Sequence, residues 1–130
     1  LDECLKKGQS VFFFPEGTST DGSNVKQFKS SLFEVCYGEL FKRKNWGSVQ
    51  PITIIYKSPI ADDPSFYSFW REEDTIFANI KKIIKRAGQG RVQLVFHRPL
   101  QFSKYSNRKH LSYACFKNVK SGLVNSENSF

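Results

Sequence analysis

A single carboxylate stands in a short polar turn that directly follows an apolar run near the start of the sequence. The run is Val11 to Phe14, and the turn is Pro15-Glu16-Gly17-Thr18. The ends of buried strands are where α/β proteins place ligand chemistry. Glu16 is suited to ordering the loop or holding a ligand hydroxyl, and Gly17 lets backbone N–H groups approach a phosphate closely. The residues themselves leave two readings open: a ligand-binding carboxylate, or one that only caps backbone amides.

Other catalytic templates fail on this sequence. Two glycines after the apolar run have P-loop spacing, but Ser23 stands where a lysine must reach the phosphates and Asn24 where a hydroxyl must hold magnesium. No Gly-x-Ser-x-Gly segment is present to form a nucleophile elbow. His97 and His110 have no metal-ligand or acid–base companion at helical spacing, so we interpret each as an ordinary strand or surface histidine. We therefore predict no catalytic residue, metal site or cofactor within this chain.

The turn must be positioned by alternating strands and helices. Apolar runs predict strands over 10–14, 49–56 and 92–96, and helical spacing predicts helices over 1–7, 31–44, 75–87 and 109–121. The strand over 10–14 does not alternate, so we expect it to be buried on both faces. Ser31 and Glu34 have the spacing of a capping box, and Pro51, which cannot donate to a ladder, is expected at a strand start or edge. Strands separated by helices predict an α/β fold with a mostly parallel sheet flanked by helices.

The composition indicates one domain with unevenly distributed charge. A length of 130 residues with 39% hydrophobic content suits a single core. We expect residues 1–124 to form the domain and residues 125–130 a flexible tail. Residues 1–74 carry nine basic and eleven acidic side chains, a net charge of −2, whereas residues 75–130 carry eleven basic and one acidic, a net charge of +10.

This basic half predicts an anionic partner, either a membrane surface or a nucleic acid, unless it is simply a solvated face. Aromatic residues interleave with basic ones around Tyr105 and Tyr113, but no nucleic-acid-binding module matches, so we expect no nucleic-acid partner. No stretch approaches the ~18 apolar residues of a membrane-spanning helix.

The three cysteines, Cys4, Cys36 and Cys115, are widely spaced and include no Cys-x-x-Cys pair. An odd number at such spacing argues against a disulfide framework or a zinc site and fits a reducing compartment. We expect all three to be buried structural thiols.

Five segments in order resemble the glycerolipid acyltransferases, the group that includes lysophosphatidic acid acyltransferase. The segment 14–18 reads Phe-Pro-Glu-Gly-Thr, as in the family's third motif, Phe-Pro-Glu-Gly-Thr-Arg-Ser. Segment 28–33 is similar to the helix start that follows this motif, and segment 49–54, Val-Gln-Pro-Ile-Thr-Ile, is similar to the fourth motif. Segments 69–71 and 92–100 resemble the family's tryptophan-containing segment and its Val-x-Val-x-Phe-x-x-Pro-Leu strand. The first likeness is specific, and the other four are weak singly but strong together.

The resemblance implies a function and a set of site residues. It implies transfer of an acyl group from acyl-CoA or acyl carrier protein to a lysolipid, such as 1-acyl-glycerol-3-phosphate, in phospholipid biosynthesis. Acceptor binding would then fall to Glu16, Gly17, Thr18, Ser19 and Pro51. The alternative reading is a non-catalytic domain that binds lipid or an anionic membrane surface through the basic half.

Two departures from the family's pattern matter. Ser19 stands where the third motif has arginine, and serine cannot replace the charge that grips a phosphate bidentately. The acceptor is therefore expected to differ from plain lysophosphatidic acid, and a lysophospholipid or an amino-acid-linked lipid is favoured.

The family's His-x-x-x-x-Asp dyad, in which histidine is the general base, is also missing: Phe102 stands five residues after His97, and Cys115 five after His110. We expect a carboxyl-terminal part of an acyltransferase domain that is inactive alone. The dyad and a membrane anchor would lie in a missing or separately encoded amino-terminal half. The chain itself would be peripheral at the cytoplasmic face of the membrane.

Overall fold

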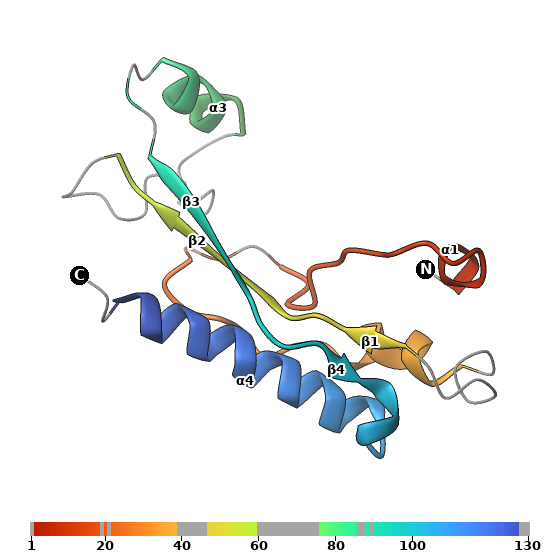
Figure 1. The fold of residues 1–130 in the computed structure, drawn as a ribbon. Helices are drawn as coiled ribbons and strands as arrows, with labels where there is room; N and C mark the ends of the chain where they lie inside the picture. The colour runs from red at the N-terminus through yellow and green to blue at the C-terminus, as the bar shows by residue number, and fades with distance from the viewer. Residues whose placement is uncertain are drawn as a thin grey trace.

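The computed structural model describes residues 2–18, 20, 22–38, 47–59, 76–85, 88 and 90–127 (Figure 1). Along the chain the elements are two-residue and six-residue strands, short helices, and one long carboxyl-terminal helix. They are α1 (Asp2–Lys6), η1 (Ser30–Tyr37), β1 (Ser48–Val49), β2 (Ile52–Lys57), α3 (Ile76–Ile84), β3 (Arg91–Phe96), β4 (Leu100–Gln101), η2 (Phe102–Lys104) and α4 (Arg108–Glu127).

The strands form two antiparallel pairs that follow one another along the same two stretches of chain (Figure 1). In β2 and β3, Ile52 pairs with Phe96 and Lys57 with Arg91, while β1 pairs with β4. The ladder breaks at Pro51, which lies directly before β2, so the prediction that Pro51 stands at a strand start is confirmed. Neither described pair is parallel. The mostly parallel sheet flanked by helices stays a prediction for the whole domain.

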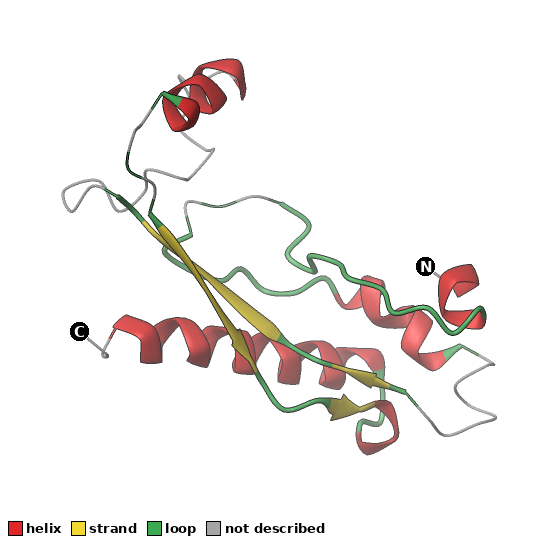
Figure 2. Ribbon diagram, turned by 45° about the horizontal axis from the view of Figure 1, so that its top comes forward, coloured by secondary structure: helices red, strands yellow, loops and turns green. Residues whose placement is uncertain are grey.

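The long helix α4 lies against β2 and η1 (Figures 1 and 2). Its first turn is capped by Asn107, whose Oδ1 accepts from the N–H groups of Lys109 at 2.9 Å and His110 at 3.0 Å. Leu111, Cys115 and Gly122 are buried on the side that faces the rest of the domain. The predicted helix over 109–121 is thus confirmed. It continues to Glu127, past residue 124, where we expected the domain to end.

The predicted helix over 31–44 is a 3₁₀ helix in its described part, and its capping box is wrong. The helix begins at Ser30, with Lys29 as the N-cap residue and no side-chain cap bond. Ser31 therefore lies inside the first turn and cannot cap it. Glu34 forms a salt bridge with Arg108 of α4 instead. The expected continuation over 39–44 lies outside the described residues.

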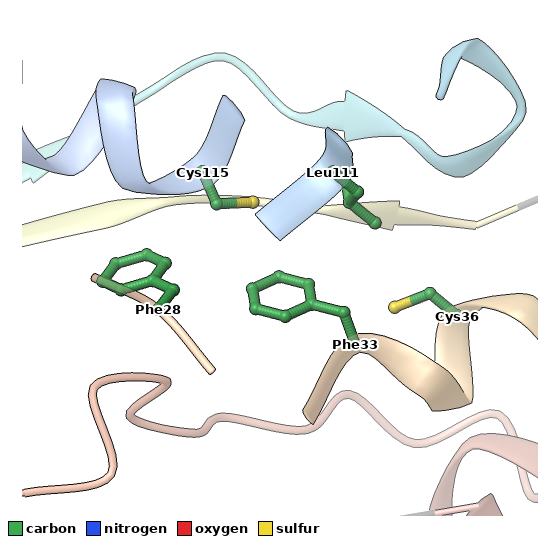
Figure 3. Close-up of a cluster of buried hydrophobic side chains, with 5 residues drawn as sticks. All are labelled: Phe28, Phe33, Cys36, Leu111 and Cys115. Atoms are coloured by element: carbon green, nitrogen blue, oxygen red, sulfur yellow. The ribbon is translucent and has the colours of Figure 1, made fainter. Parts of the chain in front are cut away.

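The core is a small cluster between η1 and α4 (Figure 3). Its buried members come from the segment before η1, from η1 and from α4: Phe28, Phe33, Cys36, Leu111 and Cys115. Burial raises the pKa of the Cys36 thiol to about 11 and that of Cys115 to about 12, so both stay protonated. Their prediction as buried structural thiols is confirmed. For Cys4, which is exposed, it is wrong.

The predicted strand over 10–14 is wrong, because these residues have no ladder partner among the described residues. The segment is extended, with Phe13 turned toward the core cluster while Phe12 and Phe14 are 63% and 67% exposed. A strand that is buried on both faces needs packing partners on each face. Within the described residues, this segment packs against the core cluster on one face only. The predicted helices over 1–7 and 75–87 are present as α1 and α3.

Candidate functional site

The Pro-Glu-Gly-Thr segment forms a hydrogen-bonded turn at the surface. The Gly17 N–H donates to the Phe14 carbonyl oxygen at 3.3 Å, with Pro15 and Glu16 at the centre of the turn. Gly17 has a φ of +66°, in the left-handed region where a residue with a Cβ is strained. The backbone therefore requires glycine here. Gly17 and Thr18 are both exposed.

One aromatic ring anchors this turn to the core. Phe13 packs edge-to-face on Phe33, with ring centroids 5.4 Å apart. Phe12 and Phe14 contact each other at 5.2 Å instead. Because Phe13 precedes the turn by only two residues, the position of Glu16 depends on the packing of Phe33.

Two hydrogen bonds join the turn to the far end of the loop that follows it. The Lys26 N–H donates to Glu16 Oε2 at 2.8 Å, and the Lys29 N–H donates to the Pro15 carbonyl oxygen at 2.8 Å. Glu16 therefore does cap a backbone amide, which is one of the two readings of the sequence. An ionised carboxylate offers about four lone-pair sites, so this bond leaves room for a ligand hydroxyl.

The side chain of Lys29 lies over the turn. A Cβ atom at Gly17 would be 2.7 Å from Lys29 Nζ, 2.8 Å from Cε and 2.9 Å from Cδ. The absence of a side chain at Gly17 thus admits a lysine from twelve residues further along the chain. Sequence reasoning missed this residue, which it used only as part of a helix start. The signal available in the sequence was the lysine itself, which follows a motif whose usual arginine is replaced by Ser19.

The structure does not gather all the predicted site residues. Glu16, Gly17 and Thr18 share one turn, and Ser19 lies outside the described residues. Pro51 is buried between β1 and β2, where its carbonyl oxygen accepts from the His97 N–H at 3.0 Å. Among the described residues, no hydrogen bond joins Pro51 to the turn.

His97 has a structural hydrogen-bond network. The Thr53 hydroxyl donates to the Val119 carbonyl oxygen at 2.8 Å, so its oxygen accepts the 2.8 Å bond from His97 Nε2–H. Burial lowers the pKa of His97, which favours the neutral ring. His110 Nδ1 lies 2.8 Å from Ser106 Oγ at the exposed start of α4. Neither histidine is paired with a carboxylate by these contacts.

A surface pocket lies away from the turn. It is an open pocket of about 240 Å³ between the segment before η1 and α4, lined by Gln27, Phe28 and Ser30 on one side and by residues including Lys109 and Tyr113 on the other. It contains none of the predicted site residues. Within the described ranges, no three His, Cys, Asp or Glu side chains are grouped as metal ligands would be. No helix in this part of the structure is long and apolar enough to cross a membrane.

Two curated proteins are similar to the chain. The lyso-ornithine lipid O-acyltransferase of Rhodobacter capsulatus is 40% identical over 124 residues, which is 95% of this chain and 44% of the relative. The chloroplastic 1-acyl-sn-glycerol-3-phosphate acyltransferase of Arabidopsis thaliana is 31% identical over 102 residues, 78% of this chain and 22% of the relative. No family model and no solved structure matches.

The chain belongs to the glycerolipid acyltransferase family, as the Phe-Pro-Glu-Gly-Thr segment indicated. It spans less than half the length of either curated relative. The relatives are named for acyl transfer to two different lysolipids, one linked to an amino acid and one to a phosphate.

Proposed function

We propose that this chain is part of an enzyme that transfers an acyl group from acyl-CoA or acyl carrier protein to a lysolipid, and that the turn around Glu16 binds the acceptor. The observation that carries the proposal is the closed Pro-Glu-Gly-Thr turn, in which Glu16 Oε2 accepts from the Lys26 N–H at 2.8 Å. Identity of 40% over 95% of the chain to a lysolipid acyltransferase supports it.

The acceptor is an amino-acid-linked lysolipid rather than plain lysophosphatidic acid. Ser19 lacks the guanidinium that suits a phosphate. The more similar of the two relatives above acts, by its name, on lyso-ornithine lipid. Two independent observations, a substitution within the motif and an overall identity, thus favour the same acceptor class.

The general base lies outside these 130 residues. His97 donates Nε2–H to Thr53 within the fold, and neither histidine has an aspartate five residues later. The complete domain would extend the described strands into a mostly parallel sheet flanked by helices, with residues 1–124 as its carboxyl-terminal part. Val92, Leu94 and Phe96, which are half or more exposed along one face of β3, support a further covering layer.

Thioester release with lyso-ornithine lipid as acceptor tests this function. We expect no turnover by the 130-residue chain, and turnover when it is produced together with an upstream His-x-x-x-x-Asp segment. In that complete enzyme, Glu16→Gln should lower kcat/KM about 100-fold. Glutamine can still accept from the Lys26 N–H, but it turns a donor toward the acceptor hydroxyl.

Glu16→Gln separates the two readings of the carboxylate, with Glu16→Ala and Lys26→Ala as its controls. Glu16→Ala loses both the loop contact and the ligand contact, whereas Lys26→Ala keeps the backbone N–H and should retain activity. If Glu16→Gln were as active as the unchanged enzyme, the carboxylate would serve only to close the loop. Turnover by the isolated chain would refute the placement of the base.

A membrane surface is the second partner that we propose, at the cytoplasmic face and through α3. Its apolar side chains Phe77 and Ile84 are 83% and 75% exposed, and Ile80 lies between them at helical spacing. Lys81 and Lys85 are exposed, and the helix contains no acidic residue. A short basic amphipathic helix with an uncovered apolar face suits the interface of an anionic bilayer.

Co-sedimentation with vesicles tests α3 as the membrane contact. Phe77→Ser with Ile84→Ser should reduce partitioning onto vesicles containing anionic lipid about tenfold, because the buried apolar area is lost. The matched control is Val92→Ser with Leu94→Ser, on the exposed face of β3. An equal loss in the control would rule out α3 as the basis of membrane binding, and equal binding to neutral vesicles would rule out a contribution from its basic side chains.

A further inference from the structure

The ammonium group of Lys29 has an unusual position for a surface lysine. Its stem crosses the face of Gly17, with Cδ, Cε and Nζ all within 3 Å of where a Cβ would lie. Within the described part of the chain, no hydrogen bond or ion pair engages the ammonium. The charge therefore stands over the turn without a counter-ion there.

Two features hold the Lys29 side chain over the turn, and the neighbouring carboxylate bonds to another group. The Lys29 N–H donates to the Pro15 carbonyl oxygen at 2.8 Å, which ties the root of the side chain to the turn. The positive φ of Gly17 turns the backbone so that its bare face receives the stem. Glu16 Oε2, on the residue before Gly17, accepts from the Lys26 N–H. An ordinary exposed lysine has none of these restraints.

We propose that Lys29 binds the anionic group of the lysolipid acceptor at the turn, where Ser19 supplies no arginine. This inference rests on the function proposed above. The ligand chemistry is a carboxylate or a phosphate attached to a single acyl chain. A lysine is a compact point charge and binds either anion, whereas the planar fork of arginine suits bidentate recognition. One ammonium balances the single charge of an amino-acid carboxylate better than it balances a phosphate.

Binding of lysolipids in neutral detergent micelles by the full chain tests this role without requiring catalysis. The probes are lyso-ornithine lipid for a carboxylate, lysophosphatidic acid for a phosphate, and monoacylglycerol as the uncharged reference. We expect the two lipids that carry a carboxylate or a phosphate to bind more tightly than monoacylglycerol. Lys29→Met should weaken their binding about tenfold and leave monoacylglycerol unchanged, because methionine keeps the stem and removes the charge. Lys29→Arg should restore most of the preference.

Lys26→Met is the matched control, since it removes an equal charge from the same loop. It should retain the preference for the lipids that carry a carboxylate or a phosphate, and both variants should unfold at the temperature of the unchanged chain. Gly17→Ala should reproduce the loss by displacing the stem, and Lys29→Met should then add nothing further. An equal loss in Lys26→Met, or an unchanged preference in Lys29→Met, would overturn the role of Lys29 and leave the proposed function standing. Failure of all three lysolipids to bind would overturn both.

Discussion

Replacement of Gly122 by alanine is expected to lower the free energy of unfolding by about 2 kcal/mol. A Cβ at this position would collide with Thr53 Oγ1 and lie 2.9 Å from His97 Nε2. Thr53 is 2% exposed and donates to the Val119 carbonyl oxygen, so it cannot move without breaking a partly buried hydrogen bond. Alanine has a better helix propensity than glycine, and this offsets about 1 kcal/mol of the cost of the collision.

A double-mutant cycle in urea unfolding identifies the cause. Thr53→Ala removes the hydroxyl that the new methyl group would strike, so Gly122→Ala should cost much less in that background. Ser121→Ala, one residue earlier on the exposed side of α4, is the control and should change stability by less than about 0.5 kcal/mol. Additive costs of Gly122→Ala and Thr53→Ala would show that the helix does not depend on this close approach.

Local patterns predicted the elements that depend on local signals. The apolar spacing of α3, the expected helix at α4, the apolar runs of β2 and β3, and the break at Pro51 all appear in the structure. The capping box failed because the helix begins at Ser30, one residue before the predicted start, and its N-cap residue Lys29 is placed by its bond to Pro15 rather than by propensity. The apolar runs alone do not determine the direction in which strands pair, and the two described pairs are antiparallel.

Only part of the candidate site could be predicted from the sequence, because local signals again revealed only what is local. Glu16 and Gly17 were found because motif and turn chemistry are contiguous in the sequence. Lys29 was not, because its approach to Gly17 depends on closure of the loop by the Lys26 and Lys29 backbone bonds. Contacts made across a closed loop leave no periodic signal, and the missing arginine at Ser19 was the single hint that another cation was needed.

Replacement of Phe33 by alanine should have the largest effect on stability, lowering the free energy of unfolding by about 3–5 kcal/mol. Phe33 is 1% exposed and joins the buried cluster of η1 and α4 to the ring of Phe13. Its loss leaves a cavity that the small core cannot fill by collapse, and it also frees the segment that leads into the turn. Urea unfolding measures the first effect, and amide hydrogen exchange at Gly17 and Lys26 measures the second.

Phe14→Ala is the matched control because it deletes the same ring one residue before the turn, where that ring is 67% exposed. It should cost less than about 1 kcal/mol and leave exchange at Lys26 unchanged. Phe33→Leu, which keeps most of the apolar volume, should fall between the two. Equal costs for Phe14→Ala and Phe33→Ala would mean that the cluster does not anchor the turn. Faster exchange at Lys26 only in Phe33→Ala would show that the core holds Glu16 in place.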